Sequence, residues 1–201
     1  YGVQAQGAAS MVQAVADRKL ESLEEVHTFA DGIAVKSPGN LSYEMVREYV
    51  DELVTVSDDE IAAAILTLME KQKIVSEGAG AVSVAAVLFN KLPLKGKKVV
   101  CIISGGNIDV NILSRVISRG LLKTGRKASL TLSLLDKPGQ LEEVSRIIAE
   151  LGANVTKVDH NMNVEDSDIN GCYLTLRIET RDFKHIEEIK KRFREEGFLL
   201  V

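Results

Sequence analysis

The chain has 201 residues, of which 45% are hydrophobic and 27% charged, an ordinary balance for a globular protein. Its formal net charge of −4 provides neither a basic surface for nucleic acid nor electrostatic attraction to an anionic membrane. No apolar run approaches the roughly 18 residues needed to span a bilayer, and no signal peptide is visible. Cys101 and Cys172 show no metal-binding or redox spacing, which indicates a reducing, cytoplasmic location.

Residues 1–122 alternate short apolar segments with amphipathic ones, the pattern of a mostly parallel α/β sheet. Because the chain opens at Tyr1, without an initiator methionine and inside an expected strand, we expect it to be part of a longer protein. We expect strands at residues 1–4, 52–56 and 99–103, and helices at residues 11–16, 43–49, 61–71, 77–91 and 110–122. Ser42 is expected to cap one helix, and Ser57 with Glu60 forms a capping box for the next.

The stretch from Lys97 to Asp109 is the most informative part of the chain. The continuous apolar run from Val99 to Ile103 is typical of a strand that is buried on both faces of a parallel sheet. It ends at Ser104-Gly105-Gly106-Asn107, and open α/β sheets bind ligands beyond the carboxyl ends of their strands. The glycines let a flat ligand approach the backbone, and Ser104 offers a hydroxyl. The alternative is a tight turn with no ligand, because this short motif is weak by itself.

The remainder of the chain changes pattern after a polar linker at residues 123–127. Strands are expected at residues 128–135, 153–164, 171–180 and 198–201, with helices at residues 141–151 and 183–196. Asp182 is expected to cap the last helix. Residues 165–170 form a polar, acidic hairpin loop in this interpretation. The order βαββαβ predicts a ferredoxin-like α+β domain over residues 128–201.

The histidines carry no clear catalytic pattern. His27, His160 and His185 have no serine or cysteine partner at catalytic spacing. We therefore expect them to have surface or packing roles.

Five motifs in residues 1–122 support a family resemblance: GVQAQGA at 2–8, TFADGIAV at 28–35, VTVSDDEI at 54–61, EGAGA at 77–81 and SGGNID at 104–109. With these motifs in this order, residues 1–122 resemble the later part of the threonine ammonia-lyases, which are fold-type II pyridoxal-phosphate enzymes. Residues 128–201 resemble an ACT domain, a regulatory module that binds small molecules. The resemblance implies a lyase that converts L-threonine to 2-oxobutanoate and ammonia, as in isoleucine biosynthesis.

The resemblance also implies which residues hold the pyridoxal 5'-phosphate. Ser104 would hydrogen-bond the pyridine nitrogen, with Gly105 beside it, and the backbone of Gly32 would run along the ring. Glu77 matches a carboxylate near the active site, although it could instead cap the helix that follows it.

The resemblance implies no metal site in this chain. The positions that bind a divalent cation in the related serine racemases correspond to Gln4, Ala8 and Ser10, none of which is a carboxylate. Hard cations such as Mg²⁺ and Ca²⁺ favour carboxylate oxygens.

No lysine of this chain matches the Schiff-base lysine of the family, which lies in an earlier segment together with the phosphate-binding glycine loop. We therefore do not expect these 201 residues to catalyse the reaction alone. Two alternatives remain open: an amino-acid-binding regulatory module without catalysis, and a serine dehydratase or racemase of the same fold.

The small domain resembles its family at the turn between its first strand and first helix, where ACT domains often bind an amino acid. The matching residues are Asp136, Pro138, Gly139, Gln140 and Leu141, and Asn154 would face the ligand from a paired domain. Backbone amides at a helix start suit a carboxylate. The implied effector is isoleucine or valine, and the implied assembly is a homodimer or homotetramer. Alternatively, Pro138-Gly139 is only a turn and Leu141 belongs to the core.

Overall fold

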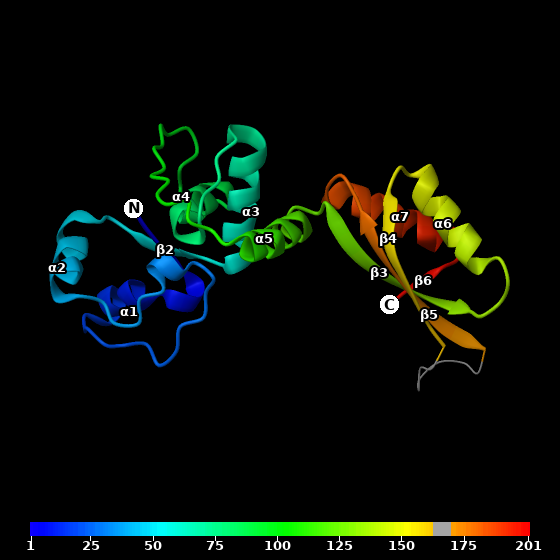
Figure 1. Cartoon of the computed structure of the whole chain (residues 1–201), viewed down its shortest axis with the longest axis horizontal. Helices are drawn as coiled ribbons and strands as arrows, with labels where there is room; N and C mark the ends of the chain where they lie inside the picture. Colours follow the sequence, from blue (N-terminus) through cyan, green and yellow to red (C-terminus); the bar gives the residue numbers. More distant parts are fainter. Residues whose placement is uncertain (163–169) are drawn as a thin grey trace. The chain divides into compact units, whose positions relative to one another are not determined.

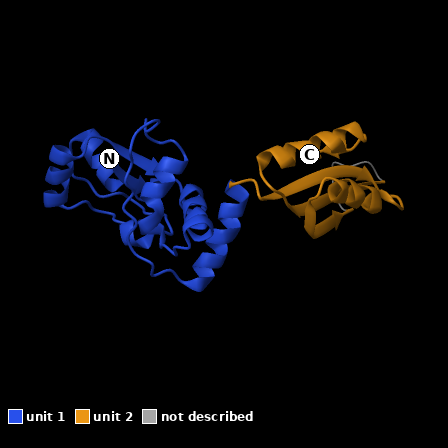
Figure 2. Ribbon diagram, turned by 90° about the horizontal axis from the view of Figure 1, so that it is seen from above, with its two compact units in different colours: residues 1–123 blue, residues 124–201 orange. Residues whose placement is uncertain are grey.

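The computed structural model describes residues 1–162 and 170–201 and divides the chain into two compact units, residues 1–123 and 124–201 (Figure 2). Unit 1 ends with helix α5 (Val110–Lys123), and unit 2 opens with strand β3 (Lys127–Leu135). Both ends of the expected linker, residues 123–127, therefore belong to regular elements. Of the expected hairpin loop, residues 165–170, only Asn170 lies within the described residues.

Unit 1 combines a short parallel sheet with several helices (Figure 1). Strands β1 (Gly2–Ala5) and β2 (Leu53–Val56) pair in parallel, with Gly2 opposite Leu53. The other helices are α1 (Ser10–Asp17), α2 (Asn40–Tyr49), α3 (Asp58–Thr67) and α4 (Gly78–Leu88). Shorter helical turns lie at Gln6–Ala8, Asp31–Ile33 and Leu68–Gln72. The expected α/β class is confirmed, and the helices lie close to the predicted ranges.

The predicted strand at residues 99–103 is wrong. Residues 97–109 adopt no regular structure, and Val100 and Ile102 are 91% and 79% exposed. An apolar run becomes a parallel strand only where neighbouring strands accept and donate its backbone hydrogen bonds. Within residues 1–162 and 170–201, β1 and β2 pair only with each other and offer this run no partner. The segment instead follows helix α4, where the Ser83 hydroxyl donates to the carbonyl oxygen of Ile102 at 2.8 Å.

Close packing of helix α4 determines where this segment lies. A Cβ on Gly80 would overlap the carbonyl oxygen of Ser104, and a Cβ on Gly78 would lie 2.8 Å from the Cα of Ala30. Only glycine permits such an approach between two backbones. The first turn of α4 is therefore the point at which residues 28–35 and 101–106 converge.

Two of the three predicted helix caps are confirmed. The backbone N–H of Glu60 donates to the Ser57 hydroxyl at 3.3 Å, and the Glu60 carboxylate accepts from the Ser57 N–H at 2.8 Å. Asp182 likewise accepts from the backbone N–H of His185 at 2.8 Å. The cap expected at Ser42 is wrong, because α2 begins three residues earlier than expected, after Gly39, and has no side-chain cap.

Unit 2 has the predicted βαββαβ order (Figure 1). After β3 come α6 (Gln140–Glu150), β4 (Asn154–Asn161), β5 (Gly171–Glu179), α7 (Phe183–Glu195) and β6 (Leu199–Leu200). The strands form one antiparallel sheet in the order β4-β5-β3-β6. Alternate residues of β3 and β5 are buried in a core shared with α6 and α7, which confirms the half-buried strands expected from the alternating pattern.

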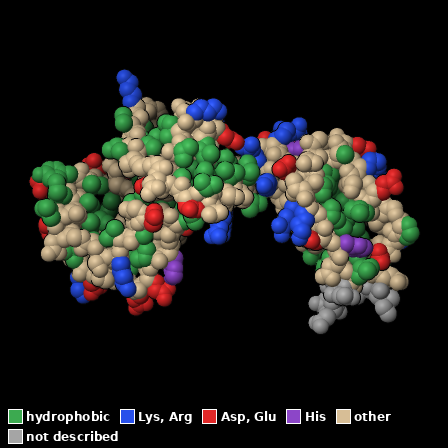
Figure 3. Space-filling view, in the orientation of Figure 1, with side chains coloured by type: hydrophobic (Ala, Val, Ile, Leu, Met, Phe, Trp, Pro, Cys, Tyr) green, Lys and Arg blue, Asp and Glu red, His purple; other side chains and the backbone are tan. Residues whose placement is uncertain are grey.

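Hydrophobic side chains also lie at the surface of unit 1, for example Leu41, Met45 and Tyr49 on helix α2 (Figure 3). These three residues are spaced four apart, so they share one face of α2. Within the described residues, no helix is long and apolar enough to cross a bilayer.

Candidate functional site

Three of the four residues predicted to bind the cofactor meet at the start of helix α4. The backbone N–H of Glu77 donates to the carbonyl oxygen of Gly105 at 3.3 Å. The Glu77 Oε1 lies 3.3 Å from the position that a Cβ on Gly32 would take. A Cβ on Gly105 would overlap the same carboxylate. The carboxylate of Glu77 therefore lies between two stretches of backbone that have no side chain facing it.

Gly105 adopts a conformation that favours glycine. Its φ of 74° lies in the left-handed region, where an L-residue is strained. Any other residue at this position would be strained by the positive φ, and its Cβ would also overlap the Glu77 carboxylate. Both facts explain why this residue is glycine.

Ser104 joins the same region through its backbone, because its carbonyl oxygen packs against the Cα of Gly80. The residue is exposed, and its hydroxyl has no hydrogen-bond partner among residues 1–162 and 170–201. A hydroxyl in this state can donate to, or accept from, an incoming ligand.

Glu77 occupies the N-cap position of α4, but its side chain makes no capping hydrogen bond. Its side chain lines a cavity of about 300 Å³ together with Phe29, Asn107 and Ile108. The carboxylate thus lies beside Gly105 and does not bind the amides of its own helix. The alternative role as a side-chain helix cap is therefore wrong, and the role near a ligand stays a prediction.

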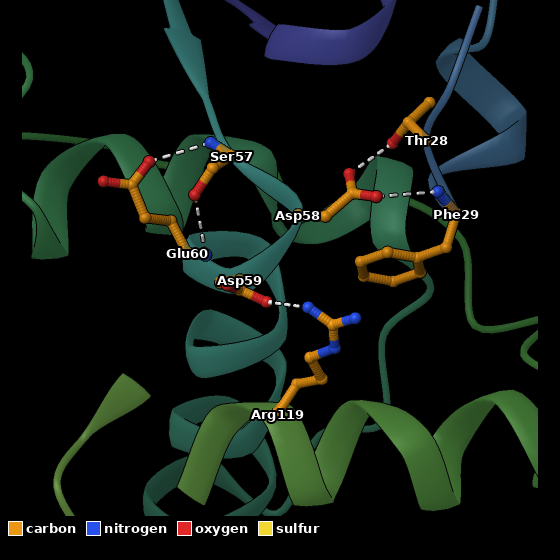
Figure 4. A network of polar contacts seen from close by, with 7 residues as sticks. All are labelled: Thr28, Phe29, Ser57, Asp58, Asp59, Glu60 and Arg119. Carbon is orange, nitrogen blue, oxygen red and sulfur yellow. Dashed lines mark hydrogen bonds and ion pairs between the residues drawn. The ribbon is translucent and has the colours of Figure 1, made fainter. Parts of the chain in front are cut away.

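The segment that carries Gly32 is fixed by Asp58, a residue to which the sequence assigned no role. In Figure 4 the Asp58 carboxylate points toward Thr28 and Phe29. It accepts from the Thr28 hydroxyl at 2.6 Å and from the Phe29 backbone N–H at 3.2 Å. The neighbouring Asp59 instead pairs with Arg119 of α5 at 3.0 Å (Figure 4). Asp58 belongs to the VTVSDDEI motif, but its partners, about 30 residues away, are not visible in the sequence.

The predicted effector residues of unit 2 also come together. Asp136, Pro138, Gly139, Gln140 and Leu141 all line one cavity of about 430 Å³ at the start of α6. Gly139 is the N-cap of α6 and provides no side-chain cap, so the first amides of the helix lack that partner.

Asn154 lies elsewhere. It begins β4, donates to Glu179 at 3.2 Å, and does not line the cavity within one chain. Its predicted role from a paired domain stays a prediction.

His160 and Cys172 line the same cavity, and sequence reasoning missed both. Burial raises the pKa of the Cys172 thiol above its ordinary value, and the nearby carboxylate of Asp136 raises it further. Both effects disfavour the thiolate. The pairing of β4 and β3 with β5 brings these residues to the effector cavity, and the sequence does not show this pairing.

A protein-family model described as "Pyridoxal-phosphate dependent enzyme" matches residues 1–105, which include Gly32, Glu77, Ser104 and Gly105. The chain belongs to this family. The expected family and its cofactor, pyridoxal phosphate, are thereby confirmed for residues 1–105.

Two curated relatives match almost the whole chain. L-threonine ammonia-lyase of Thermotoga maritima is 50% identical over 197 residues, which are 98% of this chain and 49% of the relative. L-threonine ammonia-lyase of Geobacter sulfurreducens is 39% identical over 99% of this chain and 50% of the relative. The chain therefore spans about half the length of the curated relatives it matches.

Two solved structures share the fold of part of the chain. The processed form of threonine deaminase isoform 2 from Solanum lycopersicum matches 60% of this chain and 34% of its own, with 34% identity and a TM-score of 0.55. Maize serine racemase matches 58% of this chain and 38% of its own, with 30% identity and a TM-score of 0.51.

Proposed function

We propose that residues 1–123 form one wall of the active site of a threonine ammonia-lyase, which converts L-threonine to 2-oxobutanoate and ammonia. The observation that carries the proposal is the convergence of Gly32 and Gly105 on the carboxylate of Glu77, next to Ser104 in the chain. The names of the curated relatives support the choice of threonine as substrate.

The residues present suit pyridoxal phosphate. The space beside Gly105 is taken by the Glu77 carboxylate, and the exposed Ser104 offers a hydroxyl for a ring nitrogen. When bound, the cofactor withdraws electrons from the substrate, which lets the α-proton and the β-hydroxyl leave. Because the Ser104 hydroxyl is neutral, it does not stabilise a proton on the ring nitrogen as a carboxylate would. This favours elimination over transamination.

Catalysis requires two parts that have no match in these 201 residues: the Schiff-base lysine and the phosphate-binding glycine loop. The chain covers 49% of its relative from Thermotoga maritima, and the resemblance assigns both parts to an earlier segment. We therefore propose the activity for a protein that carries this earlier segment together with the 201 residues, and the assay uses that protein.

The test measures formation of 2-oxobutanoate from L-threonine by this protein with pyridoxal phosphate. We expect turnover with threonine, and a loss of about tenfold or more when Ser104→Ala removes one hydrogen bond to the cofactor. Ser37→Ala is the control, because Ser37 is exposed and its hydroxyl forms a hydrogen bond with that of Ser22, away from the predicted cofactor residues. A protein that binds the cofactor without turning over any amino acid would overturn the proposal and favour a non-catalytic role.

A serine dehydratase or racemase is the second candidate for the active site. The similarity to maize serine racemase, with a TM-score of 0.51, favours it. Assays with L-serine in parallel distinguish the two functions. Turnover of serine to pyruvate or D-serine that exceeds turnover of threonine would select this candidate.

For unit 2 we propose regulation by an amino acid, as in an ACT domain, with isoleucine or valine bound in the 430 Å³ cavity. The amides at the start of α6 have no side-chain cap and suit the ligand carboxylate. Leu134 and Leu141, which line the cavity, suit a branched aliphatic side chain.

Calorimetric titration of isoleucine, valine and threonine into the 201-residue chain tests the regulatory proposal. We expect binding of a branched aliphatic amino acid that is weakened at least about tenfold by Leu141→Asp, because the acid would repel the ligand carboxylate. Leu199→Asp is the control, since Leu199 is 65% exposed on β6 and does not line the cavity. Equal effects of both variants, or no binding at all, would contradict the proposal.

We further propose a homodimer or homotetramer in which Asn154 contacts the effector bound to a neighbouring copy. Light scattering gives the assembly size. Asn154→Ala is expected to weaken effector binding while leaving the cavity of its own chain intact, because Asn154 does not line that cavity. A monomeric chain that binds effector at full strength would exclude this role.

A further inference from the structure

Three side chains of the kinds that bind transition metals meet at one end of the sheet in unit 2. Asp136 follows β3, His160 lies on β4, and Cys172 lies on β5, the strand between the other two. One carboxylate oxygen, one imidazole nitrogen and the thiol sulfur all lie within 4.8 Å of one another. Each ligand comes from a separate part of the chain, so linear spacing does not reveal the cluster.

The strand register explains why the side chains converge. Cys172 pairs with Leu134, and His160 pairs with Leu174. Residues that pair across antiparallel strands project from the same face, as do residues two apart on one strand. His160 and Cys172 therefore share the face that carries the helices and the core.

The cluster has a buried floor and an open rim. Cys172 is buried, whereas Asp136 and His160 are exposed, and all three line the 430 Å³ cavity. An ion can therefore enter from solvent and reach the thiol at the bottom of the cavity.

The spacing suits a metal better than a direct contact. The His160 Nε2 lies 3.8 Å from the Asp136 Oδ1, which is too long for a hydrogen bond. In a tetrahedral zinc site, a nitrogen and an oxygen ligand bound at 2.0–2.2 Å lie about 3.3–3.5 Å apart. A shift of about 0.3–0.5 Å would therefore bring the pair to the separation of two ligands that share one ion.

We propose that Asp136, His160 and Cys172 bind one zinc ion, or a transition-metal ion of similar preference, in the cavity at the start of α6. Zinc accepts oxygen, nitrogen and sulfur ligands in this combination, whereas Mg²⁺ and Ca²⁺ favour oxygen alone. Three protein ligands leave a fourth position open to water or a small anion. The site goes beyond the proposed function and does not depend on it.

The chemistry of binding is a proton exchange. The Cys172 S–H bond breaks, the thiolate sulfur binds the ion, and the proton passes to solvent. No oxidant or reductant takes part. The ordinary alternative is an exposed Asp136–His160 pair above a buried cysteine that serves only as core.

Cobalt titration of the reduced 201-residue chain separates these alternatives. Bound Co²⁺ reports a thiolate ligand through a charge-transfer band in the near ultraviolet. We expect one Co²⁺ per chain with this band, displacement by Zn²⁺, and no displacement by Mg²⁺. Cys172→Ser should abolish the band, while Cys101→Ser, which removes the other thiol of the chain, should leave it unchanged.

His160→Gln provides the second variant, because His160 is exposed and its replacement leaves the core intact. We expect at least about tenfold weaker Co²⁺ binding, since even residues that only orient a metal ligand contribute tenfold or more. Circular dichroism verifies that each variant is folded. No charge-transfer band in the folded wild-type chain, a band that survives Cys172→Ser, or unchanged affinity in His160→Gln would each overturn the proposal.

Discussion

The backbone of Glu77 donates to the carbonyl oxygen of Gly105 at 3.3 Å, while the Cα of Gly105 faces the Glu77 carboxylate at a distance that leaves no room for a Cβ. Glu77 therefore contacts Gly105 in two ways. Its backbone N–H forms a hydrogen bond, and its carboxylate packs against the Gly105 backbone. The backbone hydrogen bond positions the turn, and the missing Cβ allows the carboxylate to remain beside it. This arrangement leads to the first prediction.

Gly105→Ala should displace the Glu77 carboxylate, and Gly96→Ala is its matched control. The two glycines have φ values of 74° and 76°, but no atom lies within 4 Å of a Cβ on Gly96. Each alanine should cost about 1–2 kcal/mol of backbone strain. Only Gly105→Ala should also shift the ¹³C resonance of the Glu77 carboxyl group, because a flexible carboxylate moves aside under the new methyl group. An equal shift in both variants would show that strain alone is responsible.

Asp58→Ala should loosen the segment that carries Gly32. The Thr28 hydroxyl and the Phe29 N–H both lose a charged acceptor, and each such hydrogen bond contributes about 1.5–3 kcal/mol. Hydrogen exchange at the Phe29 amide should therefore accelerate at least about tenfold.

Asp59→Ala is the control for Asp58→Ala, because both residues lie in the first turn of α3 and carry the same charge toward its dipole. The ion pair between Asp59 and Arg119 is exposed and contributes about 0–1 kcal/mol. Exchange at Phe29 should be nearly unchanged in this variant. Equal acceleration in the two variants would mean that the loss of helix-terminal charge, and not of the Asp58 hydrogen bonds, is the cause.

Glu60 should make the stability of unit 1 depend on acid pH. Burial raises the pKa of Glu60, but the bonds to the Lys91 ammonium and to the Ser57 N–H outweigh burial and lower the pKa below its ordinary value of 4.5. A lowered pKa in the folded state stabilises the protein above the unfolded value. This contribution should be lost as the pH falls below 4.5 and through the folded-state pKa.

Denaturant unfolding of the wild type and Glu60→Gln across this pH range measures the effect. The wild type should lose stability on acidification relative to Glu60→Gln, which cannot titrate at this position. Glu44→Gln is the control, because the Glu44–Arg47 pair is exposed on α2. The same acid dependence in Glu60→Gln and the wild type would assign the loss to other carboxylates.

Local signals predicted much of the fold. The Ser57–Glu60 capping box and the Asp182 cap depend on residues three apart, and the βαββαβ order of unit 2 depends on alternation within each strand. The apolar run from Val99 to Ile103 failed as a predictor, because a strand also needs a partner and the described residues provide none. An apolar sequence by itself therefore does not predict a strand, because it does not show whether a partner strand lies beside it.

Some residues of the candidate sites were predicted from sequence motifs, and others were found only in the structure. The glycines and Glu77 were found by motif, and the structure brings them together at the start of α4. Asp58 and His160 were missed because their roles arise from contacts across the chain: Asp58 reaches Thr28 30 residues away, and His160 meets Cys172 through the sheet register. A sequence records residue types but not which distant residues become neighbours.

His185 supplies the last prediction, because the sequence indicated only a packing or surface role for it. The buried ring accepts from the backbone N–H of Arg181 through Nδ1 at 3.1 Å and faces the carbonyl oxygen of Leu151 through Nε2 at 2.9 Å, which requires the proton on Nε2. His185→Phe would leave both backbone groups unpaired and should destabilise unit 2 by about 2–4 kcal/mol in denaturant unfolding. Lys184→Ala, at the exposed neighbouring position of α7, should change it by less than about 0.5 kcal/mol. A phenylalanine variant as stable as the wild type would show that packing of the ring, not its two hydrogen bonds, connects α7 to the end of α6.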